Sequence, residues 1–273
     1  MFVLNIVILL ASSVVLSLIA IPLIYHLLLN NNCIALNFRK QEIPIGMGLV
    51  FILVQTFVIF IYAIYNTNND NYIFAYIISI LIVGLVGIID DLVGEKEIKG
   101  FKGHISSLMK FRLTTGGLKL LAGGASAFIL SLTIYTRFID FIINILLIAL
   151  FTNLVNLFDL RPGRACKIFI LISIVLIFSA TSSKYNYILI SLLCIVLIYM
   201  PYDLKAKAMM GDTGSNVLGM TLGAFCAGTQ TFWIKIFCLF LLVVLHIVSE
   251  FYSISKIIEK NKLLCYIDKL GRK

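Results

Sequence analysis

Long apolar runs alternate with short polar stretches along most of the chain. A helix needs about 20 mostly apolar residues to cross a bilayer, and most of the runs approach that length. We therefore predict an all-α, polytopic transmembrane bundle of about nine spans. The runs cover roughly residues 2–29, 47–65, 73–89, 116–136, 138–155, 167–181, 185–201, 215–228 and 231–249.

The overall composition agrees with this pattern. Hydrophobic residues make up 61% of the 273 residues and charged residues only 13%, with a mean hydropathy of +1.06. A soluble domain of this size does not need so much apolar sequence. The formal net charge of +9 is explained by basic residues that collect in loops on one side of the membrane, so we expect no nucleic-acid partner.

The distribution of basic residues predicts an orientation. On alternate loops, one side would hold Arg137, Lys184 and Lys235, whereas the other holds most of the 22 lysines and arginines. The basic side is expected to be cytoplasmic, which puts the N-terminus outside and the C-terminus inside the cell membrane. Residues 2–29 are interpreted as a retained first span. We expect residues 1–250 to form the membrane domain and residues 251–273 a basic, amphipathic cytoplasmic tail.

An acidic pair stands where the third apolar run meets a basic loop. Asp90 and Asp91 are adjacent, in the stretch Gly84-Leu-Val-Gly-Ile-Ile-Asp-Asp-Leu-Val-Gly94. Ionised carboxylates at that depth are expected to bind a divalent metal or to pair with Lys or Arg. A helix end with two solvated acids is the alternative. Lys119, about one turn inside the next run, would either pair with this acidic pair or extend toward the interface.

Two further polar clusters lie on the side predicted to be cytoplasmic. Asn153, Asn156 and Asp159 are spaced i, i+3, i+6, so they would share one helical stripe. Such a stripe can hold helices together, but the basic residues after it favour recognition of an anionic ligand. Those basic residues are Arg161, Arg164 and Lys167.

The second cluster is Met209-Met-Gly-Asp-Thr-Gly-Ser215, directly ahead of an apolar run. Asp212, Thr213 or Ser215 is expected to cap that helix, and the glycines allow a tight backbone there. Together the clusters place four acids and several cations on one membrane face. This set fits Mg²⁺-assisted phosphoryl chemistry on a lipid and a soluble nucleotide.

The motifs resemble those of one family, over roughly residues 37–250. The chain is similar to the polyprenyl-phosphate N-acetylhexosamine-1-phosphate transferases of glycosyltransferase family 4, which include phospho-N-acetylmuramoyl-pentapeptide transferase. The resemblance rests on Gly87-Ile-Ile-Asp-Asp-Leu-Val-Gly94, Asn153-Leu-Val-Asn-Leu-Phe-Asp159 and Met210-Gly-Asp-Thr-Gly-Ser-Asn-Val-Leu-Gly219, in the order of the family.

The resemblance implies an activity. It is the Mg²⁺-dependent transfer of an N-acetylhexosamine 1-phosphate from a UDP-sugar to undecaprenyl phosphate, with release of UMP, for cell-wall or surface-glycan synthesis. The active site would face the cytoplasm, and a homodimer would be expected. The implied roles are a base for Asp90 or Asp91, phosphate binding for Lys119, Mg²⁺ ligation for Asp212, and binding of the nucleotide end for Asn156 and Asp159.

Two departures from the family pattern are visible. The family usually continues its middle motif as Asp-Gly-Leu-Asp-Gly, whereas Leu-Arg-Pro-Gly follows Asp159 and Pro162 replaces the second acid. A His-rich stretch, often connected with sugar recognition, does not follow His246. The alternatives are therefore a relative that binds UDP-sugar or lipid phosphate without turnover, and a transporter of anionic solutes. The sequence does not specify the donor sugar.

Overall fold

The computed structural model describes residues 2–66, 70–94 and 114–272. Each of the nine predicted apolar runs corresponds to a long helix in this part of the chain, and the predicted ends differ by a few residues. The helices are α1 (Phe2–Asn30), α2 (Leu49–Asn66), α3 (Asn71–Val93), α5 (Thr115–Ile134), α6 (Phe138–Phe158), α7 (Arg164–Ser179), α8 (Asn186–Leu204), α9 (Gly211–Thr229) and α10 (Phe232–Phe251).

Six of the helices in the described ranges are long and apolar enough to cross a membrane, namely α1, α3, α5, α6, α8 and α10. The protein is thus a helical, multi-pass membrane protein. The prediction of nine spans is met in part, because α2 counts as a shorter apolar helix, α7 has only 16 residues, and α9 has 19 residues that include many small and polar ones.

Helix α9 lies at the centre of the bundle, where it packs mainly against α6 and α3. Nearly all of its residues are buried. Glycines on α9 allow this close packing, since a Cβ on Gly219 would lie 2.2 Å from the carbonyl oxygen of Phe151 on α6. A helix surrounded by protein need not be apolar on every side, which explains its modest hydrophobicity.

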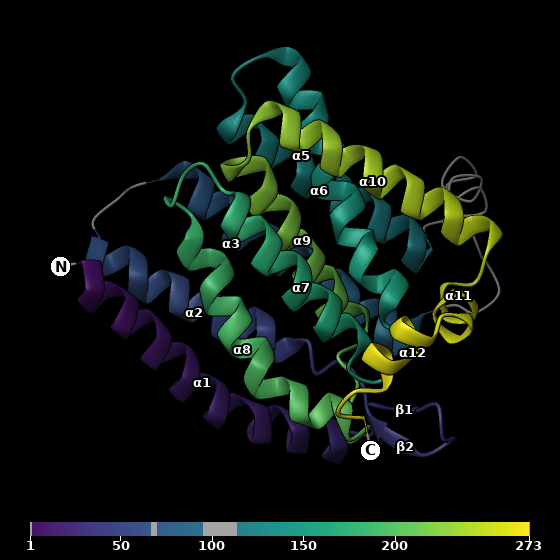
Figure 1. The fold of residues 1–273 in the computed structure, drawn as a ribbon. Coiled ribbons are helices and arrows are strands. Elements are labelled where there is room, and N and C mark those ends of the chain that lie inside the picture. Colours follow the sequence, from purple (N-terminus) through teal and green to yellow (C-terminus); the bar gives the residue numbers. More distant parts are fainter. Residues whose placement is uncertain (1, 67–69, 95–113, 273) are drawn as a thin grey trace.

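The polar ends of the helices lie together at one end of the bundle, as predicted. We call the end of the bundle where α3, α6 and α8 finish and α5, α7 and α9 begin the site end. The N-terminus lies away from this end, whereas strands β1 and β2, helices α11 and α12, and the C-terminus gather at it (Figure 1). At the opposite end, Lys235 pairs with Asp140 at 2.9 Å. Most of the second basic loop, residues 95–113, lies outside the described residues.

The loop between α1 and α2 forms a small hairpin. Strands β1 (Ile34–Leu36) and β2 (Glu42–Pro44) pair antiparallel, with Ile34 opposite Pro44. The following segment joins the approach to α9, because the amide of Met47 donates to the carbonyl of Met209 at 3.1 Å. The hairpin therefore holds the start of α9 in place.

The chain ends in two short helices, α11 (Ile254–Lys260) and α12 (Lys262–Lys269). Leu263, Tyr266 and Leu270 are exposed on or beside α12. Ser255, Asp268 and Arg272 of the segment contact the site end, so this part of the predicted tail is docked on the bundle.

Candidate active site

Asp91 joins α3 to the beginning of α9. Its carboxylate accepts hydrogen bonds from the backbone amide of Asp212 at 2.8 Å and from that of Thr213 at 3.0 Å. The hydroxyl of Thr213 donates a third bond at 2.6 Å. The first amides of a helix lack intrahelical partners and carry partial positive charge, so a carboxylate there is stabilised.

The backbone before α9 is shaped for this contact. Gly211 has a φ of +66°, and a Cβ at this position would lie 2.3 Å from a carboxylate oxygen of Asp91. Only glycine combines this conformation with so close an approach. The expectation that α9 is capped from its own sequence is wrong. Met210 occupies the N-cap position without a side-chain bond, and the capping carboxylate comes from α3.

Lys119 connects the two other acids. Its ammonium group lies 2.6 Å from a carboxylate oxygen of Asp90 and also forms an ion pair with Asp212. All three side chains are about one-fifth exposed, at 21–22%. The predicted pairing of Lys119 with the acidic pair is thus present through Asp90, and the structure adds Asp212 to it.

The convergence of two carboxylates on one cation suits a magnesium ion. Magnesium usually takes one or two protein carboxylates and completes its octahedron with water and substrate phosphate oxygens. Among the residues that the structure describes, no group of three or more His, Cys, Asp or Glu side chains could hold a metal by itself. Asp212 therefore fits a metal that is bound together with a phosphate ligand.

A cavity of about 660 Å³ opens beside this cluster. Its polar wall includes Asp90, Lys119 and Asn153, while small and apolar residues line the part further along α5 and α6. The apolar part includes Leu120, Gly123, Gly124, Ala149 and Leu150. One cavity thus combines charged groups at the site end with an apolar extension toward the middle of the membrane.

Asn153, Asn156 and Asp159, predicted to share one helical stripe, do not all lie together in the structure. Asn153 and Asn156 line the cavity, and the Asn156 side-chain oxygen accepts from the hydroxyl of Ser215 at 3.3 Å. Asp159 follows the last residue of α6 with φ −77° and ψ 47°, so it leaves the helical stripe. It is not among the residues that line the cavity.

Asp159 is instead half-buried, in an acidic environment. Burial, and then the negative charges of Asp203 and Asp91, raise the pKa of Asp159 well above its usual range. Asp203, near the end of α8, accepts from the amide of Gly163 at 3.0 Å. Sequence analysis missed Asp203, because nothing local indicates that the end of α8 lies beside the loop after α6.

Arg161 and Arg164, which were predicted to bind the substrate, contact other groups of the protein. The Arg161 guanidinium lies over the ring of Phe38, 5.6 Å from its centroid. Arg164 is buried and bonds to Asp268 and Ser255 of the C-terminal helices. Neither of these contacts is with the carboxylates around Lys119. His246 and Glu250 on α10 line the cavity and were also missed.

Comparisons with known proteins agree with the motifs. The profile of glycosyl transferase family 4 matches residues 73–230, more than half of the chain. Curated relatives named phospho-N-acetylmuramoyl-pentapeptide-transferase include one from Staphylococcus saprophyticus, 32% identical over 213 residues, which are 67% of this chain and 61% of the relative. Another, from Streptococcus uberis, is 27% identical over 72% of this chain and 62% of the relative.

A third relative of the same name, from Streptococcus agalactiae serotype Ia, is 27% identical over 76% of this chain and 66% of its own length. The chain thus spans less than two thirds of the length of the first two relatives. The family match includes α9 and the acidic and asparagine motifs on α3 and α6. The chain belongs to glycosyl transferase family 4.

Proposed function

We propose that the protein transfers an N-acetylhexosamine 1-phosphate from a UDP-sugar to polyprenyl phosphate and releases UMP. The name of the relatives specifies a phospho-N-acetylmuramoyl-pentapeptide group, which is a sugar phosphate of this class. In this proposal all nine long helices cross the cell membrane, the N-terminus is outside, and the site end faces the cytoplasm. The product would serve cell-wall or surface-glycan synthesis.

The observation that carries the proposal is the arrangement around Lys119. One ammonium group lies between Asp90 and Asp212, at the wall of a cavity whose other part is apolar. A diphosphate needs cations, and a prenyl chain needs an apolar surface continuous with the membrane. A cavity of about 660 Å³ that has both a cation and an apolar wall supports this proposal.

In the proposed reaction, an oxygen of the lipid phosphate attacks the sugar-bearing phosphorus of the donor. The bond from that phosphorus to the bridging oxygen breaks, and UMP leaves with this oxygen. Asp90, which lines the cavity, takes the proton of the lipid phosphate. Asp91 is less suited to this role, because its carboxylate already accepts three hydrogen bonds from the start of α9.

Lys119 is proposed to hold a phosphate oxygen and to spread the charge that develops on it. When Mg²⁺ is bound, it neutralises the diphosphate. Asp212 is its proposed protein ligand. The prenyl chain would lie along Leu120, Gly123 and Leu150.

The nucleotide end of the donor is assigned to the loop after α6. Asn153 and Asn156 offer amide groups in the cavity, and Asp159 and Arg161 follow in the loop after α6. A half-buried carboxyl such as Asp159 is stabilised by a ligand that donates hydrogen bonds to it. The structure ties Arg164 to the C-terminal helices, and its proposed contribution is therefore indirect.

The test measures UMP release from purified protein with undecaprenyl phosphate and a panel of UDP-N-acetylhexosamines. We expect turnover with at least one donor. EDTA should abolish it and added Mg²⁺ should restore it, because the described residues hold no group of three or more side chains that would retain the ion against a chelator.

Two other outcomes have clear meanings. Donor binding without UMP release across the panel would indicate a relative that binds without turnover, for which Pro162 in place of an acid is the motivating observation. Flux of an anionic solute in vesicles, without UMP release, would indicate a transporter. A homodimer remains a prediction, to be tested by the mass of the detergent-solubilised protein.

A further inference from the structure

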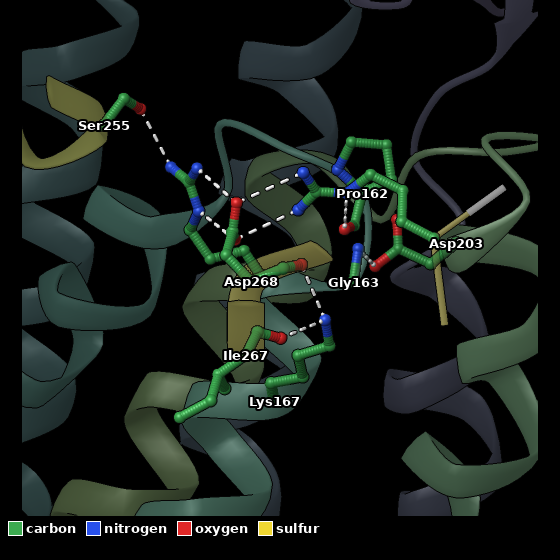
Figure 2. Close-up of polar contacts among 9 residues, drawn as sticks. Pro162, Gly163, Lys167, Asp203, Ser255, Ile267 and Asp268 are labelled. Atoms are coloured by element: carbon green, nitrogen blue, oxygen red, sulfur yellow. Dashed lines mark hydrogen bonds and ion pairs between the residues drawn. The ribbon is translucent and has the colours of Figure 1, made fainter. Parts of the chain in front are cut away.

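Helix α12 is fastened to the bundle by one carboxylate between two arginines. Asp268 accepts from Arg164 at 2.8 Å and 3.1 Å, and from Arg272 at 3.2 Å and 3.0 Å (Figure 2). The side chains of Arg164 and Asp268 are only 4% and 9% exposed. Forked, charge-assisted bonds of this kind fix orientation as well as distance.

Further contacts connect α12 to the beginning of α7 and to the loop before it. Lys167 donates to the carbonyls of Ile267 and Asp268 at 2.9 Å and 2.7 Å, which satisfies acceptors at the end of α12. Arg272 donates through Nε to the carbonyl of Pro162 at 3.0 Å. Arg272 therefore contacts Asp268 and the loop at the same time.

The loop 159–163 is held from other sides as well. Asp203 on α8 accepts from the amide of Gly163, whose φ is +75°. Arg161 lies over Phe38 of the hairpin turn. The loop therefore lies among α8, α12 and the hairpin, and its first residue is Asp159. Pro162 is only three residues from Asp159, so a shift at Pro162 is expected to move the Asp159 carboxyl as well.

Asp268 is ionised at neutral pH, where it pairs with Arg164 and Arg272. Burial alone would raise the pKa of Asp268, but the hydrogen bonds from Arg164 and Arg272 outweigh it and lower this pKa to about 2. A carboxyl whose pKa falls on folding stabilises the fold above its unfolded pKa of about 3.9, and this contribution disappears as the pH falls toward 2. The ion pairs of Asp268 with Arg164 and Arg272 are therefore not expected to change near neutral pH.

We infer that α12 is a positioning element for the donor-binding loop, in which Asp268 and Arg272 hold residues 159–163 in the place from which Asp159 and Arg161 meet the nucleotide. The inference rests on the proposed function for the identity of the ligand. The contact between α12 and the loop does not depend on the proposed function. Asp268 and Arg272 are positioning residues, because they act through the loop.

The first experiment compares Asp268→Asn with the wild type in the full-length protein. We expect the amides of Leu160, Arg161 and Gly163 to exchange with deuterium at least about tenfold faster in the variant, because the loop loses one of its supports. The KM for the UDP-sugar should rise about tenfold, since misplacing a binding group by a fraction of an ångström is costly. The kcat and the KM for polyprenyl phosphate should stay within about twofold of the wild type.

Two further variants make the test specific. Arg272→Lys keeps a positive charge near Asp268 but cannot reproduce the fork and the bond to Pro162, so it should show the same rise in donor KM. Lys269→Gln is the matched control, because Lys269 is an exposed cation on the same helix. It should leave the exchange of the loop and both KM values unchanged.

Each result decides between the possibilities. If the loop amides exchange at the wild-type rate in both Asp268→Asn and Arg272→Lys, the inference that α12 holds the loop is overturned. Faster exchange with an unchanged donor KM overturns the positioning role. A fall in kcat together with an equal rise in the KM for both substrates shows a general structural role instead. If the wild type releases no UMP, the proposed function fails, and the exchange data together with the affinity for UMP then decide the inference.

Discussion

Replacing Asp90 with asparagine is expected to lower the rate of UMP release about 10³-fold, which is the usual scale for loss of a general base. Asparagine has nearly the same shape, but it can neither accept the proton of the lipid phosphate nor keep its charge beside Lys119. The side chain lines the cavity and its recorded ion pair is with Lys119. The temperature of unfolding in detergent should therefore change little.

Asp91→Asn is the matched comparison for this prediction. The carboxylate of Asp91 accepts from two amides and one hydroxyl at the start of α9, and an amide group would bring N–H donors against those donors. Leaving such groups unsatisfied costs about 1–3 kcal/mol. This variant should lose stability as well as activity, because Asp212 is displaced with its helix.

The two measurements, UMP release and thermal unfolding, separate the roles of the acids. Activity of Asp90→Asn above about a tenth of the wild type would contradict its assignment as the base. If Asp91→Asn were inactive but as stable as the wild type, the base would have to be Asp91. The interpretation of its three hydrogen bonds as structural would then be wrong.

The nine long helices were predictable because hydrophobic runs are a local property of the sequence. The meeting of the acidic motifs at one end also followed, since connected helices alternate in direction. Their detailed pairing did not follow. Asp91 and Asp212 are separated by 121 positions along the chain, and no local pattern indicates that one caps the helix of the other. The expected cap from Asp212, Thr213 or Ser215 was the natural but incorrect inference.

The C-terminal segment shows a second limit. Its alternating basic and apolar residues are typical of a helix at a membrane surface. The same pattern does not reveal that Asp268 faces Arg164, or that Arg272 reaches Pro162. Arg164 was predicted to bind an anionic substrate because free and paired arginines look alike in a sequence. Its anionic partner is a carboxylate of the chain itself.

The close contact between α3 and α9 leads to the second large effect, expected for Gly87→Ala. Gly87 lies one turn before the acidic pair, and a Cβ there would be 2.6 Å from both the Cα and the amide nitrogen of Thr213. Backbone atoms cannot move aside as a flexible side chain can, so α9 must shift by nearly 1 Å to reach ordinary contact. A shift of this size commonly reduces activity about 100-fold.

The same substitution should lower the free energy of unfolding by about 3 kcal/mol, the upper part of the range for overpacking. Gly123→Ala on α5 is the control for stability. A Cβ there meets nothing within 4 Å, and alanine favours a helix over glycine by about 1 kcal/mol, so this variant should be at least as stable as the wild type. Thermal unfolding of both variants and UMP release of Gly87→Ala check the prediction. If Gly87→Ala kept full activity and stability, α3 and α9 could not be in the contact that places Asp91 on the start of α9, and the arrangement of the proposed site would be wrong.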